Sequence, residues 1–234
     1  MKKELSTKQI SADKDLNIII YATLIPLIVY FVFGNQIMDF VKSNDGNIWL
    51  KSIPIMLIQY GLAGFGSSIV MLYRKEKPTD YGVVKKNFIK TILLSVVVCI
   101  PAFVFMLVNN EIGSYLPLQG CNLTREFLAS GFPTNVLGYG LIVLIWGLWE
   151  GFNYVVISRK VNERYPGKNQ WLNTGAITCG ILCVLIHGMI GVDLYTIFEA
   201  ITTFVLIYGM LIIKDKTNNA WGCVLISLLF WNAF

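Results

Sequence analysis

The residues of this sequence that are able to do chemistry stand out because they interrupt long apolar segments. The ionisable ones are Glu150, His187 (the only histidine) and Glu199, while Asn153 and Asn232 add strong hydrogen-bonding groups. A carboxyl group and a histidine removed from bulk water can share a proton or hold a water molecule as a nucleophile, and an asparagine amide can donate to a developing oxyanion. The same side chains can also serve as hydrogen-bonded links between helices.

The spacing of these residues around the loops predicts their depths. In an antiparallel helix pair, residues equally far from the turn lie at the same level, because both helices rise 1.5 Å per residue. The loop at 166–169 is centred between Glu150 and His187, so we expect these two residues at the same level on neighbouring helices. The same construction about the last loop brings Asn232 within one helical turn of Glu199. A polar cluster of Glu150, His187, Glu199 and Asn232 is therefore the predicted site.

No metal or cofactor is expected at this cluster. Cys179, Cys183 and His187 recur at every fourth residue and so lie along one helix face. A zinc site needs three or four ligands that converge on one point, which three successive turns of one helix do not provide. Glycine-rich phosphate-binding loops and the G-x-S-x-G pattern of serine hydrolases are absent from the sequence.

The elements that must hold these residues are transmembrane helices. Hydrophobic residues make up 55% of the 234 residues and charged residues 14%, with a mean hydropathy of +0.61; a soluble domain has about 25% charged residues. Apolar runs of about 20 residues are long enough to span a bilayer. The last of the seven runs is short and is predicted as a short span, a re-entrant piece or a helix shielded by its neighbours. The runs are 16–34, 48–73, 88–108, 134–157, 172–191, 194–213 and 221–234.

The distribution of basic residues predicts the orientation. Of the 19 Lys and Arg residues, 16 fall in the N-terminal tail and in every second loop after it, and three fall in the remaining loops. Cytoplasmic loops carry the excess of Lys and Arg. The sequence therefore predicts an all-α, multi-pass cell-membrane protein with a cytoplasmic N-terminal tail (1–15) and one transmembrane domain (16–234), whose candidate functional core is 134–234. The net charge of +5 is explained by basic loops facing membrane lipids, so no nucleic-acid partner is expected.

Small residues indicate where the helices approach one another closely. Gly61, Gly64 and Gly66 lie together in the second run, and Gly147 and Gly151 form a GxxxG pair in the fourth. Small residues at such spacing allow close contacts between transmembrane helices. We expect packing contacts at both places.

Three segments carry a resemblance to a known family. Glu150-Gly-Phe-Asn-Tyr-Val155, Cys183-Val-Leu-Ile-His187 and Leu228-Leu-Phe-Trp-Asn232 are similar to the EExxxR, FxxxH and HxxxN motifs of the CPBP family. This family of intramembrane proteases includes the CAAX prenyl endopeptidases and proteins linked to bacteriocin self-immunity. The resemblance implies a glutamate-type endopeptidase for membrane-associated peptides, in which Glu150 and His187 activate water and Asn232 occupies the last motif position.

The motifs are incomplete, which leaves three functions open. Gly151, Val155 and Leu228 replace the second glutamate, the arginine and the second histidine, with Ser227 beside the last of these. Loss of one oxyanion donor costs about 10²–10³ in rate. The alternatives are an endopeptidase, active or weakened, a non-catalytic scaffold, immunity or binding protein of the same fold, and a small-solute transporter subunit that uses the polar cluster. Against the transporter, the spans show no internal repeat.

Overall fold

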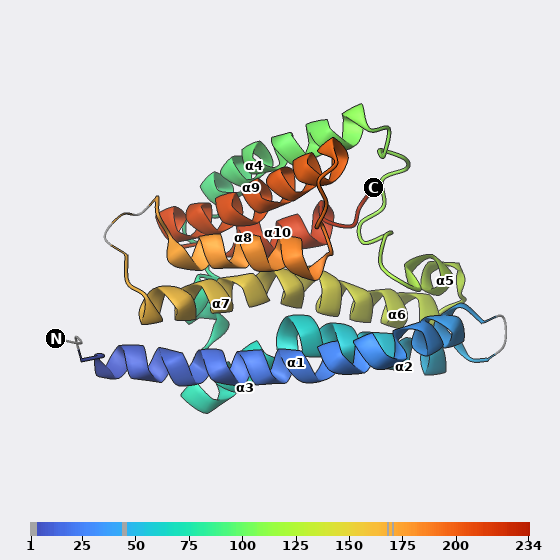
Figure 1. Cartoon of the computed structure of the whole chain (residues 1–234). Helices are drawn as coiled ribbons and strands as arrows, with labels where there is room; N and C mark the ends of the chain where they lie inside the picture. The colour runs from blue at the N-terminus through green and yellow to red at the C-terminus, as the bar shows by residue number, and fades with distance from the viewer. Residues whose placement is uncertain (1–3, 44–45, 168, 170) are drawn as a thin grey trace.

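The chain forms a helical bundle in the computed structural model, which describes residues 4–43, 46–167, 169 and 171–234 (Figure 1). These residues form helices and no strand. Five helical stretches are long and apolar enough to cross a membrane, so the prediction of a helical membrane protein is confirmed at that level. They are α1 (Thr7–Lys42), α2–η1–α3 (Ile48–Arg74), α4 (Phe88–Val108), α6–η3–α7 (Thr134–Arg164) and α9 (Leu194–Thr217).

Two of the long stretches change their winding midway. The second consists of α2 (Ile48–Tyr60), the π-helical η1 (Gly61–Phe65) and α3 (Gly66–Arg74). The fourth consists of α6 (Thr134–Ile142), the π-helical η3 (Val143–Trp149) and α7 (Glu150–Arg164). The two π-helical segments contact each other.

The remaining helices are shorter. They are η2 (Pro78–Tyr81), α5 (Thr124–Ala129), α8 (Thr174–Ile186) and α10 (Trp221–Leu229). With nine residues, α10 is only about 14 Å long, about half the ~30 Å of a hydrocarbon core. It packs against α4, α7, α9 and η3, and Gly222, Cys223 and Val224 are buried there. The short last run thus contains a helix shielded by its neighbours.

Helix α1 begins well before the apolar run that predicted it. Ser6 caps the helix by accepting a hydrogen bond from the Gln9 backbone, and the Gln9 side chain accepts one from the Ser6 backbone. This reciprocal capping fixes the first turn. Residues 7–15, expected to be a separate tail, therefore continue the spanning helix, and Asp15 is only 1% exposed. The S-x-x-Q pattern was the available signal for this start.

The glycine-rich contacts are present as expected. Gly61 and Gly66 face Pro26 and Ile19 of α1. Gly147 and Gly151 face α10, so both groups of small residues lie at helix–helix contacts.

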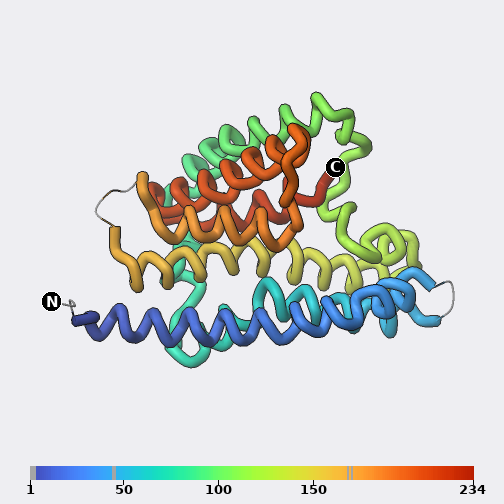
Figure 2. The backbone as a smooth tube through the Cα atoms, in the orientation of Figure 1, coloured from blue at the N-terminus to red at the C-terminus, as the bar shows by residue number. Residues whose placement is uncertain are grey.

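The loops gather at two opposite ends of the bundle. The start of α1, the 75–87 loop, the α7–α8 loop and the α9–α10 turn meet at one end, which we call the basic end. They are joined there by Arg164–Asp13, by Asn173–Asp215 and by the hydrogen bond from Asn219 to the Val84 carbonyl. In Figure 2 the chain start and the α7–α8 loop lie on one side, and α5 and the 109–123 loop lie on the other.

Candidate functional site

Glu150 is held by a partner on another span. It is the first residue of α7, directly after η3, and it is 7% exposed. The Gln59 amide of α2 donates a hydrogen bond of 3.1 Å to the Glu150 Oε2 atom. A π-helical turn often occurs at a functional position. Here η3 and η1 lie next to the two residues of this pair.

A second polar pair lies one turn further along α7. The Ser67 hydroxyl of α3 donates a short hydrogen bond to the Asn153 Oδ1 atom, and both side chains are buried. Glu150 and Asn153 thus link α7 to the α2–η1–α3 span at two successive turns. Gln59 and Ser67 come from outside the 134–234 segment, so the site draws on more of the chain than the candidate core.

The alignment of α7 with α8 is set by Gly175. The α8 helix starts against Ser158, and an added Cβ at Gly175 would lie 2.1 Å from the Ser158 carbonyl oxygen. One turn on, the Cys179 thiol contacts the Tyr154 carbonyl at 3.5 Å. Residues of α7 and α8 that lie at the same level are therefore equally far in sequence from a point between residues 166 and 167. This point is about two residues earlier than the loop centre expected from the sequence.

This alignment places Cys183, not His187, beside Glu150. Cys183 lies within electrostatic range of the Glu150 carboxyl group. His187 therefore lies one helical turn beyond the level of Glu150, about 6 Å along the axis. The difference arises because the connection is asymmetric: α7 continues to Arg164, whereas α8 starts only at Thr174.

His187 lies at the opposite end of α8 from the loop and has a different neighbour. It follows the last residue of α8, its side chain is exposed, and its ring meets the Trp231 ring edge-on at 5.4 Å. Among the described residues, no hydrogen bond or ion pair joins His187 to Glu150. The structure thus separates the two residues that were expected to activate water together.

Glu199 and Asn232 do come together. Both line a cavity of about 170 Å³ between α4, α9 and the segment after α10, together with Thr202. Glu111, which lies outside the apolar runs and was not singled out, lines the same cavity. Its carboxylate accepts a hydrogen bond of 2.6 Å from the Tyr195 hydroxyl. The expectation that Glu199 and Asn232 lie at similar depth therefore agrees with their shared cavity. No pattern in the sequence pointed to Glu111.

Ser227 belongs to neither polar group. It is buried between α10 and α7, and an added Cβ at Gly151 would lie 2.8 Å from the Ser227 hydroxyl oxygen and 2.6 Å from the Cys223 carbonyl oxygen. Gly151 therefore permits the close packing of α10. A glutamate side chain at this position would need α10 to move away.

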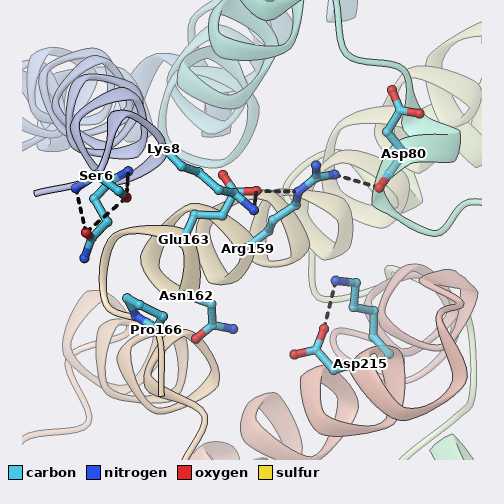
Figure 3. Close-up of a pocket in the computed structure, with 10 residues that line it drawn as sticks. Ser6, Lys8, Asp80, Arg159, Asn162, Glu163, Pro166 and Asp215 are labelled. Carbon is cyan, nitrogen blue, oxygen red and sulfur yellow. Dashed lines mark hydrogen bonds and ion pairs between the residues drawn. The ribbon is translucent and has the colours of Figure 1, made fainter. Parts of the chain in front are cut away.

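A larger polar cavity of about 500 Å³ lies at the basic end (Figure 3). Its charged side chains all have partners among the described residues, and the Asp80 carboxylate accepts a hydrogen bond of 2.7 Å from the Lys77 backbone. Arg159 binds Glu163 at 3.1 Å and the Asp80 carbonyl at 2.6 Å, and Lys214 binds Asp215 at 2.9 Å. This cavity leaves no charged side chain of its lining without a partner.

Metal binding finds no support in the described part of the chain. No group of three His, Cys, Asp or Glu side chains there converges on a point. The five cysteines are free thiols, and four of them are buried in the packed interior.

Comparison with known proteins adds no further assignment. No family model, no curated protein and no solved structure matches the chain. The chemistry of the two polar groups therefore rests on their own geometry. The Glu150 group is buried and hydrogen-bonded, whereas the Glu199 group lines a cavity.

Proposed function

We propose that this chain is a non-catalytic, multi-pass membrane protein, a scaffold or binding protein of the CPBP-like layout, in which Glu150 joins helices. The observation that carries the proposal is the hydrogen bond from Gln59 to Glu150 at a buried position one turn away from the level of His187. A carboxyl group used in this way satisfies its own hydrogen-bonding need and links two spans. The Ser67–Asn153 pair on the same helix faces supports the same role.

The proposal includes a topology of seven crossings with the N-terminus in the cytoplasm. The loops that hold 16 of the 19 basic residues meet at the basic end. Cytoplasmic loops are the ones that carry such an excess. We infer that α8 and α10 complete the five long spans, and that α10 is shielded from lipid by its neighbours.

The second candidate function is the glutamate-type intramembrane endopeptidase. The π-helical segment directly before Glu150 favours it, because such turns recur at functional positions. In this function Glu150 would activate water for cleavage of a membrane-associated peptide. His187 would have to approach Glu150 by one helical turn.

Three variants of the Glu150–Gln59 pair test whether it joins the helices. Glu150→Gln keeps an amide partner for Gln59, so we expect a folded protein with unchanged thermal stability in detergent. Glu150→Leu and Gln59→Leu each lose the link, with a coupling energy of about 0.6–1.7 kcal/mol in a double-mutant cycle. Glu126→Gln, an exposed carboxylate on α5, is the matched control.

Cleavage is measured in parallel on vesicles that hold a library of membrane-tethered reporter peptides. The proposed function predicts no cleavage by the wild-type chain. Cleavage by the wild type that is absent in Glu150→Gln, at equal folding, would overturn the proposal and establish the endopeptidase.

A further inference from the structure

The cavity beside Glu199 lies near the start of α9, and two carboxylates of different elements line it. Glu199 is the sixth residue of α9, about 7.5 Å from the start of that helix. Glu111 reaches the cavity from the loop that follows α4. Asp193, which precedes α9, adds a third negative charge within electrostatic range of Glu199. All lining residues belong to the described chain, and none of them is Lys or Arg.

The carboxylate of Glu199 has no counter-charge among the described residues. Among the described residues, no hydrogen-bond donor or cation pairs with it, whereas one oxygen of Glu111 is bound by Tyr195. A cation bound from outside the chain would supply this counter-charge.

An unpartnered hydroxyl inside the cavity is a second, independent sign of a ligand. Thr203 is only 5% exposed and lines the cavity, and its side chain makes no hydrogen bond to any described residue. Its hydroxyl oxygen is not among the fully buried atoms without a partner, a set that in the described residues holds Ser95 Oγ alone, so it keeps accessible surface at the cavity. The Asn232 side chain, half-buried at the same cavity, also makes no hydrogen bond within the described structure.

The apolar part of the lining is half aromatic. Phe105, Phe230, Trp231 and Phe234 contribute to the wall beside alanine and methionine side chains. Ring contacts hold all four in place: Phe105 against Tyr195 at 5.3 Å, Phe230 against Phe234 at 5.9 Å and Trp231 against His187 at 5.4 Å. Aromatic faces attract organic cations and are used to recognise quaternary ammonium groups. A metal ion would need several converging oxygen or nitrogen ligands, and the described residues offer no such group.

We propose that the cavity formed by Glu111, Glu199, Thr203, Asn232 and its aromatic wall binds a small organic ammonium ion. The carboxylates supply the counter-charge, the rings contact the alkyl groups, and the hydroxyl and amide hold water or a polar substituent. The volume of about 170 Å³ is below the roughly 300 Å³ at which pockets for drug-sized ligands begin, so the ligand is small. This inference goes beyond the proposed function and does not depend on the role of Glu150.

The test uses tetramethylammonium as the probe and the purified full chain in detergent micelles. Binding is followed by isothermal titration calorimetry at constant ionic strength. The neutral probe of the same shape is tert-butanol, and sodium is the inorganic competitor. Glu199→Gln removes the charge at constant shape, Glu111→Gln is a second variant that keeps a partner for Tyr195, and Glu126→Gln is the control.

We expect saturable tetramethylammonium binding by the wild type and by Glu126→Gln, and none of tert-butanol. Glu199→Gln weakens binding by roughly tenfold or more, because the cation loses its partly desolvated counter-charge. Glu111→Gln, whose thermal unfolding in the absence of ligand shows that it folds, weakens binding in the same direction. Unaltered binding by both variants overturns the inference. So does a wild-type protein that does not prefer tetramethylammonium over tert-butanol, or one from which equimolar sodium displaces it.

Discussion

At the scale of single residues, the basic end contains a largely buried network of ion pairs. Lys160 is 2% exposed, and its amino group binds Asp15 at 3.0 Å and Glu76 at 2.9 Å. Arg74 binds Asp15 from the other side at 2.7 Å, and the Tyr81 hydroxyl donates to Glu76. Burial raises the pKa of Tyr81, which keeps this donor protonated. The network joins α1, the loop after α3 and α7.

Removal of the central cation is therefore expected to be strongly destabilising. Lys160→Met leaves the buried Asp15 and the partly buried Glu76 without their shared partner, and breaking a buried pair in this way costs about 3–5 kcal/mol. Thermal unfolding in detergent measures the effect. Lys8→Met is the matched control: Lys8 pairs with Glu163, but its side chain is 71% exposed, so its loss changes stability by less than about 1 kcal/mol. Equal effects of the two substitutions would contradict this account.

At the scale of elements, Gly175 decides which residues of α8 face α7. Gly175→Ala places a methyl group against the backbone of Ser158, which cannot yield as a flexible side chain would. Overpacking of this kind costs about 1–3 kcal/mol. Gly140→Ala on α6 is the control, because no atom lies within 4 Å of its added Cβ and alanine favours a helix by up to about 1 kcal/mol.

The measurement is the unfolding midpoint of both variants in the same detergent. Destabilisation by Gly175→Ala alone supports the role of this glycine in aligning the helices. An unchanged unfolding midpoint for Gly175→Ala would show that α8 can shift along α7 without loss of stability.

The elements were more predictable than their alignment. The apolar run 88–108 coincides with α4, and the run 194–213 shares its start with α9, because the cost of burying polar groups in lipid marks such segments in the sequence. The level of His187 was not predictable in this way. It depends on how many loop residues precede α8 and on the contact at Gly175, and both are properties of the packed pair. For the same reason, the pairing of Glu150 with Gln59 was not predicted from the sequence.

At the scale of the whole molecule, the two ends of the bundle differ in charge, and the proposed orientation rests on this difference. Cysteine labelling from one side of the membrane tests it. The five native cysteines are buried or half-buried, so they give little background with a membrane-impermeant maleimide. Lys77→Cys places a thiol at the basic end, and Gly113→Cys places one at the opposite end; both positions are exposed.

In intact cells we expect the reagent to label Gly113→Cys, and to label Lys77→Cys only after the membrane is permeabilised. The physical reason is the retention of Lys- and Arg-rich loops in the cytoplasm. The reverse pattern would show that the topology is inverted. Labelling of both cysteines from the same side would contradict an odd number of membrane crossings between residues 77 and 113.

The paired π-helical turns also have a consequence for how the sequence can change by insertion or deletion. An α-helix advances about 100° per residue, so removing one residue from η3 would rotate α6 by that angle relative to α7. The stripe of α6 that contacts α5 and the stripe of α7 that carries Glu150 would then no longer point to their present neighbours. The η1 segment imposes the same constraint on Gln59 and Ser67. We therefore expect the connecting loops to tolerate insertions and deletions. We expect η1 and η3 not to tolerate them, because a change of length there changes which helix face points to each neighbour.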